Sequence, residues 1–168
     1  MSPQEISIES SIEDKIAWAE KYLERDKDMF LGDEKTDELL KRFKKAAKIS
    51  HEAMVQAGVF HECGKCEERE GGSCCGKGLE NRYSGVLILI NLLLGLELPE
   101  HRLDKKSCFF LKANGCSLLA RHVICVNYLC KKITDRIDPE KIAIMREKEG
   151  IELELLFLLN ERVKAVLK

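Results

Sequence analysis

Cysteine is absent from residues 1–62 and 131–168, although the chain of 168 residues contains 8 cysteines. A surplus of charge is also absent, because 28 Lys and Arg residues face 29 Asp and Glu residues, which gives a net charge of −1. Nucleic acids and anionic membranes attract proteins with an excess of positive charge, so we expect neither as a partner. The apolar run over residues 83–98 is also shorter than the roughly 20 apolar residues that span a bilayer.

The first residues, MSPQEISIESSIEDKIA, lack the basic start and the apolar segment of a secretory signal. This pattern predicts a cytoplasmic protein, in which thiols are reduced and clustered cysteines bind metal or take part in catalysis. Intracellular proteins of hyperthermophiles are an exception, because they contain many disulfides, and the abundance of Lys and Glu is compatible with such a source. Disulfide pairing therefore stays open as an alternative.

Several signatures of enzymes are missing as well. The sequence contains no internal repeat, no Gly-rich phosphate loop, no Ser-His-Asp order and no paired carboxylates on a helix. No residue can therefore be assigned a catalytic role. Whether the chain is an enzyme is left open at this point, and the residues specify no substrate and no particular protein partner.

The length and composition predict one domain over residues 1–168. Hydrophobic residues make up 45% and charged residues 34%, a mixture that folds into a globule without help. We divide the domain into N-terminal helices (1–60), a cysteine-cluster region (61–132) and C-terminal helices (133–168). The predicted fold class is mainly α: a helical bundle around a central apolar helix, with a cysteine-rich loop and a small β-hairpin.

Apolar residues at helical spacing predict two N-terminal helices. Ser10 and Glu13 fit a capping box at the start of a helix over residues 11–27. Residues 28–35 are expected to connect it to a second helix, which ends at Gly58 because glycine favours the left-handed conformation of a helix C-cap.

The C-terminal segment is predicted to form a helix hairpin. Asp138 and Pro139 fit the N-cap and first position of one helix, and Gly150 is expected to separate it from the next. The second helix carries a broad apolar stripe, which is compatible with burial in a monomer or with a homodimer interface. The stripe consists of Leu155, Leu156, Leu159, Val163 and Val166.

Between these helices the chain changes character three times. Residues 62–82 contain glycine at positions 64, 71, 72, 76 and 78, which predicts a loop that wraps closely around something small. Residues 83–98 are apolar on nearly all sides, which predicts a buried central helix. Asn114-Gly115 lies between two short apolar runs and predicts a β-hairpin.

The 8 cysteines carry the functional prediction, and all of them are candidate metal ligands. Thiolates in this number suit zinc or an iron–sulfur cluster, and spacing alone does not choose between the two. We expect one centre with four ligands from both halves of the pattern, with the other cysteines in a second site or in supporting roles. The candidates are Cys63, Cys66, Cys74, Cys75, Cys108, Cys116, Cys125 and Cys130.

Local spacing refines the expected ligand geometry for part of this set. Cys63-x2-Cys66 allows two sulfurs to reach one ion from a tight turn. The side chains of the adjacent Cys74 and Cys75 diverge, so one ion is not expected to bind both. At least four sulfurs, including Cys63, Cys66 and one of the four later cysteines, are expected around a common point.

Two further pairs were considered from their spacing. The predicted hairpin would hold Cys108 and Cys116 as a pair across its ends. Cys125 and Cys130 lie five residues apart, so they would face one ion only if a helix began or ended between them. His51 and His61 are alternative fourth ligands, although a single histidine is more often an ordinary surface or core residue.

The cysteine pattern resembles the family of zinc- or iron-chelating domains of the CxxCxxCC type. The resemblance covers residues 61–130 and includes Cys63-x2-Cys66, Cys74-Cys75, the Cys-Phe-Phe-Leu run at 108–111, Cys116-Ser-Leu and Arg121-x3-Cys125. It differs at His122 and Val126, where the family pattern commonly has proline and arginine. The same module is similar to part of a flagellin lysine methylase, so the resemblance implies metal binding and, as an alternative, a methyl-transferring or redox enzyme.

Three classes of function follow. The first is a metal-binding protein that coordinates zinc or an iron–sulfur cluster through its cysteines. The second is an enzyme, as the resemblance implies. The third is a helical protein held together by disulfides, without metal. Counting free thiols in the denatured protein separates the third class from the other two.

Overall fold

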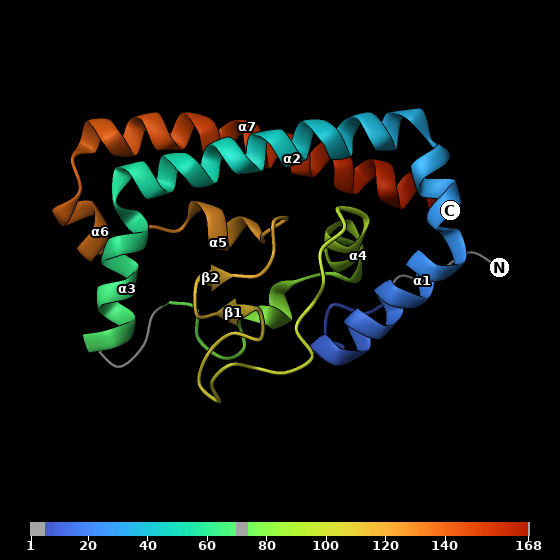
Figure 1. Cartoon of the computed structure of the whole chain (residues 1–168), viewed down its shortest axis with the longest axis horizontal. Coiled ribbons are helices and arrows are strands. Elements are labelled where there is room, and N and C mark those ends of the chain that lie inside the picture. Colours follow the sequence, from blue (N-terminus) through green and yellow to red (C-terminus); the bar gives the residue numbers. More distant parts are fainter. Residues whose placement is uncertain (1–5, 70–73, 168) are drawn as a thin grey trace.

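A computed structural model describes residues 6–69 and 74–167 of the chain. Two long helices, α2 (Glu34–Ala57) and α7 (Pro139–Val166), lie side by side and run in opposite directions (Figure 1). Helix α1 (Ile12–Gly32) lies at one end of this pair, and the short helices α3 (Val59–Arg69) and α6 (Lys131–Arg136) lie at the other. The remaining elements fill the space between these two ends.

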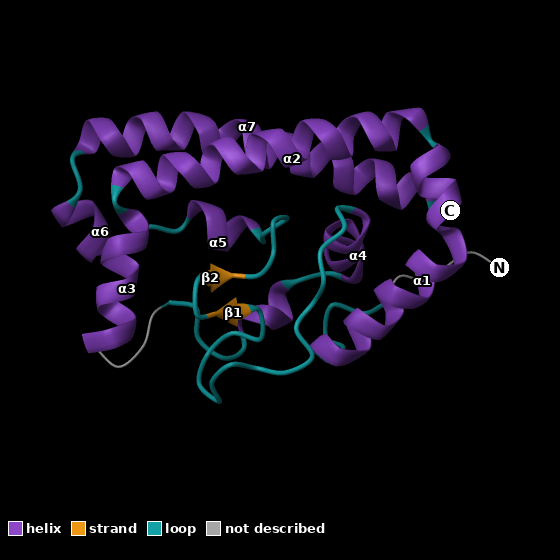
Figure 2. Ribbon diagram, in the orientation of Figure 1, coloured by secondary structure: helices purple, strands orange, loops and turns teal. Residues whose placement is uncertain are grey.

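The interior elements are short. They comprise the 3-10 helix η1 (Leu79–Arg82), helix α4 (Gly85–Leu93), strands β1 (Leu111–Lys112) and β2 (Gly115–Cys116), and helix α5 (Val123–Asn127) (Figure 2). The strands pair antiparallel, with Leu111 opposite Cys116. The mainly α fold with a small β-hairpin is therefore confirmed. Each helix in the described part of the chain is too short or too polar to span a bilayer.

The first helix begins and ends later than predicted. Its N-cap is Ser11, whose side-chain oxygen accepts a hydrogen bond from the Asp14 backbone N–H at 3.1 Å, so the predicted Ser10–Glu13 capping box is wrong by one residue. The helix continues to Gly32 because Phe30 is fully buried in the core. Asp33 then separates α1 from α2, and its carboxylate accepts from the Thr36 backbone N–H at 2.8 Å.

The predicted end of α2 and the start of α7 are confirmed. Gly58 ends α2 in the left-handed region, with φ 91°. Asp138 is the N-cap of α7 and Pro139 its first residue. The predicted break at Gly150 is wrong, since α7 runs through it, and burial of the neighbouring residues against the core outweighs the roughly 1 kcal/mol helix penalty of glycine. The stripe Leu155, Leu156, Leu159 and Val163 is buried within the chain.

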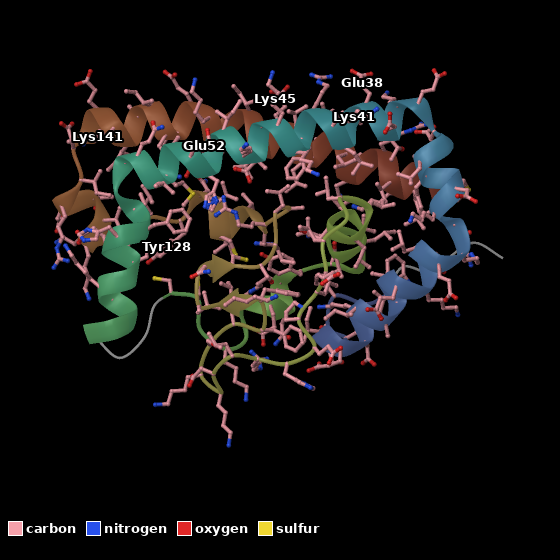
Figure 3. All side chains as sticks on the ribbon, in the orientation of Figure 1. Glu38, Lys41, Lys45, Glu52, Tyr128 and Lys141 are labelled. Carbon is pink, nitrogen blue, oxygen red and sulfur yellow. The ribbon has the colours of Figure 1, made fainter. Side chains whose placement is uncertain are left out.

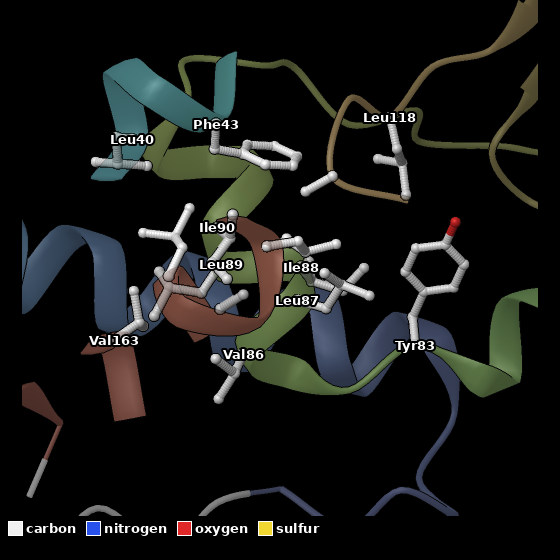
Figure 4. Packing of buried hydrophobic residues seen from close by; sticks show 14 of the residues in the cluster. Leu40, Phe43, Tyr83, Val86, Leu87, Ile88, Leu89, Ile90, Leu118 and Val163 are labelled. Carbon is white, nitrogen blue, oxygen red and sulfur yellow. The ribbon is translucent and has the colours of Figure 1, made fainter. Parts of the chain in front are cut away.

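Helix α4 is the predicted central apolar helix. Residues 85–91 are all buried, and their side chains meet those of α2 and α7 in one core (Figure 4). The helix is shorter than the predicted segment 83–98. Asn91 in its last turn is completely buried and donates to the carbonyl oxygens of Leu87 and Ala120, both at 2.9 Å. Its side-chain oxygen accepts from the Leu119 and Ala120 backbone N–H groups, which attaches α4 to the segment before α5.

Helix α1 packs on α4 at Gly85, where a side chain would not fit. A Cβ atom at Gly85 would lie 2.6 Å from Cγ2 of Ile6 and 2.7 Å from Cε3 of Trp18. Gly85→Ala is therefore expected to lower the free energy of unfolding by about 1–3 kcal/mol, the usual cost of overpacking. Urea denaturation with linear extrapolation measures the change.

Gly150→Ala is the matched control for this substitution. Apart from its chain neighbours and the adjacent backbone of helix α7, no atom lies within 4 Å of the Cβ position at Gly150. Alanine there is expected to raise the free energy of unfolding by roughly 0.5–1 kcal/mol, because it favours the helix over the unfolded chain. If both variants were stabilised, close packing of α1 on α4 would be contradicted.

The predicted loop over residues 62–82 is partly wrong. Helix α3 extends from Val59 to Arg69 and includes Gly64, so the first two cysteines lie on a helix and not in a tight turn. Val59 is buried and Cys63, one turn later, packs against the same apolar cluster, which outweighs the helix penalty of Gly64. Gly71 and Gly72 lie outside the described residues.

Candidate metal centre

Six of the candidate cysteines line one cavity of about 260 Å³ between α3, α5 and the start of α6. They come from two stretches of the chain, residues 63–75 and 125–130, that are about 50 residues apart in the sequence. The cavity is lined by Cys63, Cys66, Cys74, Cys75, Cys125 and Cys130, together with Met54, Val59, Glu62, Leu79, Ile124, Tyr128, Lys132 and Ile133. Tyr128 lies beside α3 in Figure 3 and is mostly exposed.

Helix α3 supplies the first pair of sulfurs. Cys63 and Cys66 are three residues apart, a spacing that places both side chains on one face of a helix. Both residues are half-buried and line the cavity. The Lys132 Nζ atom lies 4.0 Å from the Cys66 Sγ atom, which gives this sulfur a cationic neighbour. Helix α3, in place of the predicted tight turn, therefore places both sulfurs at one site.

The adjacent Cys74 and Cys75 have different surroundings. Cys74 is exposed, whereas Cys75 is half-buried and packs against the main core. The Cys75 carbonyl oxygen accepts from the Cys108 backbone N–H at 2.7 Å, and Gly76 forms an isolated antiparallel bridge with Ser107. This bridge fixes the backbone of Cys75 beside that of Cys108. Both residues line the same cavity, so the expectation that one ion does not bind both stays a prediction.

The buried Glu80 side chain reinforces this junction. Its carboxylate accepts from the Gly78 backbone N–H at 3.0 Å and forms an ion pair with Arg102. Arg102 also donates to the Ser107 carbonyl oxygen at 2.7 Å. Burial opposes ionisation of Glu80, but the bonds from Arg102 and the backbone outweigh it and hold its pKa below the usual value. The ion pair therefore joins the two loop segments that carry Cys75 and Cys108.

Cys125 and Cys130 lie on either side of a helix end. Helix α5 ends at Asn127, and Cys130 is the N-cap of α6, so the chain bends between the two cysteines and both line the cavity. The spacing of this pair required a helix to begin or end between the two cysteines, and the structure meets that requirement. Tyr83, which is 1% exposed, donates its hydroxyl to the Cys125 Sγ atom at 3.6 Å. Burial raises the pKa of Tyr83, as do Cys125 and Cys116, so the hydroxyl remains a donor.

Cys108 and Cys116 do not line this cavity. Cys108 is buried just before the hairpin, where its carbonyl oxygen accepts from the Leu111 backbone N–H at 3.1 Å. Cys116 is the exposed last residue of β2, opposite Leu111. It lines a smaller cavity of about 40 Å³ that also contains His51 and Arg121. The hairpin forms as predicted, but Cys108 is buried and Cys116 lines the smaller cavity, so their presentation to one site stays a prediction.

The two alternative histidine ligands lie apart from the six cysteines. The His51 ring stacks on Phe60, with centroids 4.7 Å apart, and burial followed by the charge of Arg121 lowers its pKa. His61 is exposed, with Nδ1 3.6 Å from the Glu62 carboxylate. Neither histidine lines the larger cavity.

Burial and mutual repulsion oppose ionisation of the thiols. Burial raises the pKa of Cys63 to about 11, and the neighbouring Cys75, Cys130, Cys74 and Cys66 contribute to the rise. Burial likewise raises the pKa of Cys108 to about 12. These thiols are protonated at neutral pH unless a nearby cation stabilises the thiolate, and protonated thiols are poor nucleophiles.

Cationic side chains lie beside Glu62 and beside two of the cysteines. Glu62 at the edge of the cavity accepts from Lys65 at 2.7 Å and from Arg136 at 2.9 Å, and these bonds lower its pKa to about 2. Burial raises the pKa of Cys125, and the hydrogen bond from Tyr83 and then the charge of Arg121 oppose the rise. Burial also raises the pKa of Cys116, opposed by the Leu118 backbone and then by Arg121. The electrostatic surroundings thus partly offset the negative charge that thiolates would bring.

The donor set fits a soft metal, but the sulfurs are not drawn together. Zinc binds thiolate sulfur at about 2.3 Å, and thiolates are also the ligands of iron–sulfur clusters. Among residues 6–69 and 74–167, no group of three or more His, Cys, Asp or Glu residues is placed so that it could hold a metal ion. The cysteines therefore share a cavity, while the predicted convergence on one point is not seen.

Comparisons with known proteins add no assignment. Neither family models, nor curated proteins, nor solved structures match this chain. The resemblance to the CxxCxxCC family therefore stays a prediction, and the site is interpreted from its own residues.

Sequence reasoning missed Tyr83 as a partner of Cys125 and the role of Arg121 as a buried cation. Tyrosine at the start of an otherwise apolar segment was a usable signal, because a buried tyrosine hydroxyl usually finds a hydrogen-bond partner. For Arg121, the sequence offered no signal beyond its position in the cysteine pattern. Its contacts with α2 and α7 depend on the packing of helices distant in sequence.

Proposed function

We propose that this protein binds a soft metal, zinc or an iron–sulfur cluster, through its clustered cysteines. The observation that carries the proposal is that six cysteines from two distant stretches, residues 63–75 and 125–130, line one cavity. Cysteines that served only as small apolar core residues would be distributed over the core, with no reason to gather on one wall. Binding would draw the sulfurs inward and release their protons to solvent, since thiolates are the ligands.

The free thiols support metal binding over disulfide stapling. Cys63, Cys74, Cys108, Cys116, Cys125 and Cys130 are free thiols in the structure. A set of staples would place cysteines in pairs between separate helices, with alpha carbons roughly 4.4–6.8 Å apart. A cavity wall with many sulfurs suits a shared ligand better than it suits separate pairs.

Metal analysis of protein purified without oxygen tests this proposal. We expect zinc, or iron with acid-labile sulfide, in a fixed ratio to the chain, and an absorption spectrum that separates the two. The same sample denatured with a chelator should then give all 8 cysteines as free thiols. Protein that retains no zinc or iron, before or after loading, would contradict the proposal, and a low thiol count would point to disulfides.

A further inference from the structure

Helix α7 carries an apolar row on its solvent-facing side. The row consists of Ile144, Ile151 and Leu158, which recur at every seventh position and are between 42% and 53% exposed. Seven residues bring a helix back to nearly the same direction, within roughly 20°, so the three side chains form one continuous row. It differs from the stripe predicted from the sequence, which is buried within the chain. An exposed row with this spacing is typical of a helix that packs on another helix.

A groove adjoins the apolar row where α7 meets α2, and it has a volume of about 280 Å³. Its apolar lining consists of Ala46, Ile49, Ile151 and Leu155. Its charged lining consists of Arg42, Lys45 and Lys148, with no carboxylate among the described residues. Figure 3 shows Lys45 on the edge of α2 that faces away from α4. The groove is therefore apolar inside and positively charged at its rim.

Carboxylates follow the opposite flank of the apolar row. They are Glu140, Glu147, Glu154 and Glu161, all exposed and again at every seventh position. A glutamate three positions after an apolar residue is turned about 60° to one side of the row, whereas a residue four positions after it is turned about 40° to the other side. Lys148 and Leu155 hold the latter positions and line the groove against α2. The glutamates therefore lie on the flank away from α2.

Most of these charges have no partner within the chain. Among the residues that the structure describes, Lys45 and Lys148 form no ion pair, and neither do Glu147 and Glu154. Arg42 pairs with Glu38 at 3.3 Å on the exposed surface of α2, where such a pair contributes little stability. The two rows of opposite charge are therefore available to a second molecule.

Two-fold symmetry matches the rows in one orientation. Two copies that meet through the same face have their axis in the plane of contact, either across α7 or along it. An axis across α7 would place glutamates against glutamates and cations against cations. An axis along α7 places the glutamate row of each copy opposite the cations of the other, which is the complementary arrangement.

From this pattern we infer that the α2–α7 face binds a second copy of the chain, with the two-fold axis parallel to α7. The apolar row of each copy lies against the groove of the other, and Glu154 lies opposite the partner's Lys45. The charge pattern selects a second copy as the occupant, because one face supplies both signs in the positions that the same face requires. Neither the row nor the lining of the groove contains a cysteine, so the inference does not depend on the proposed metal.

Sedimentation equilibrium of the whole chain in the presence of a reductant tests this inference. We expect a dimer at micromolar concentration, and Ile151→Glu should raise its dissociation constant by at least about 100-fold, because it places a carboxylate in the apolar contact. Leu103→Glu is the matched control, since Leu103 is 63% exposed in the loop between α4 and β1 and lies outside the row. It should leave the dissociation constant unchanged.

Charge reversal tests the same contact without an apolar substitution. The two variants are Glu147→Lys/Glu154→Lys and Arg42→Glu/Lys45→Glu. Each should be monomeric, because it places like charges opposite each other, whereas an equimolar mixture of the two should form a dimer. All four positions are exposed, so these variants keep the test decisive should Ile151→Glu fail to fold.

Cross-linking determines the direction of the axis. Carbodiimide joins a lysine to a carboxylate in direct contact, and a mixture of isotope-labelled and unlabelled chains distinguishes links between copies from links within one copy. We expect links from Glu154 to the partner's Lys45. A dimer in which such links between copies are missing would overturn the parallel axis.

The remaining outcomes concern the face and its occupant. A dimer that both Ile151→Glu and the charge reversals leave intact would overturn the assignment of this face. A wild-type chain that stays monomeric would overturn the second copy as the occupant and leave the groove to a partner of different sequence. Metal content is measured separately, so either result would leave the proposed function standing.

Discussion

If the protein binds the proposed metal, its removal is expected to open the region from α3 to α6 while α2 and α7 stay protected. The free energy of binding at a structural metal site is also folding free energy, and it reaches about 10–16 kcal/mol in zinc-finger peptides. Amide hydrogen exchange with and without a chelator measures the effect. We expect protection in α3, α5 and α6 to fall by at least about 100-fold, which corresponds to roughly 2.8 kcal/mol.

The lengths of the helices give the physical reason. Helices α3, α5 and α6 contain 11, 5 and 6 residues, below the roughly 12–15 at which isolated helices become even marginally stable. Helices α2 and α7 contain 24 and 28 residues, and both contribute buried residues to the main core. Their amides are therefore the internal reference. Equal protection of all helices with and without the chelator would contradict a structural role for the metal.

Arg121→Met is expected to lower the free energy of unfolding by about 3–5 kcal/mol at pH 7, because it leaves a buried carboxylate without its cation. Arg121 lies with its guanidinium 3.7 Å from the Glu152 carboxylate and 3.6 Å from the Met54 Sδ atom. The Glu152 side chain is 0% exposed, and the Arg121 side chain is 10% exposed. Removal of both charges should cost much less than removal of one, so Glu152→Gln in the Arg121→Met background is expected to restore most of the loss.

The effect of Arg121→Met should shrink as the pH falls. Burial raises the pKa of Glu152 above its ordinary value of 4.5, and Arg121 opposes that rise. Without Arg121 the pKa in the folded state rises further, so the carboxyl takes up a proton on folding. The cost is fully present above the folded-state pKa and disappears as the pH falls toward 4.5. Urea denaturation at pH 7 and pH 5 measures it, and an equal loss in the Glu152→Gln background would contradict the coupling.

Sequence patterns predicted the elements whose causes are local. Gly58 ends a helix, Asp138 and Pro139 start one, and Asn114-Gly115 forms a hairpin, because each depends on the conformational preference of one or two residues. Glycines were misleading where tertiary packing decides. Gly64 and Gly150 both lie inside helices, because burial of neighbouring residues on the same helix outweighs the low helix propensity of glycine.

The sequence brought out the residues of the candidate site only in part, because six of the candidate cysteines line one cavity while Cys108 and Cys116 lie outside it, and their role as metal ligands stays a prediction. The sequence identified the cysteines, and it correctly required a helix end between Cys125 and Cys130. It could not assign Cys130 to the neighbourhood of α3, because that depends on Ile133 and Ile137 packing against Met54 and Val59. Contacts between residues so far apart in the chain leave no periodic signal in the sequence.

The antiparallel pairing of α2 and α7 also has a kinetic consequence. These helices can meet only when the whole stretch from residue 58 to residue 138 is closed into a loop, and the entropy lost on closure rises with the logarithm of loop length. Cys63 and Cys130 lie near the two ends of that loop, on elements that already touch. If the proposed metal joined Cys63 to Cys130, the segment left to close would be shorter, so metal binding and pairing of the long helices would each lower the entropic barrier to the other.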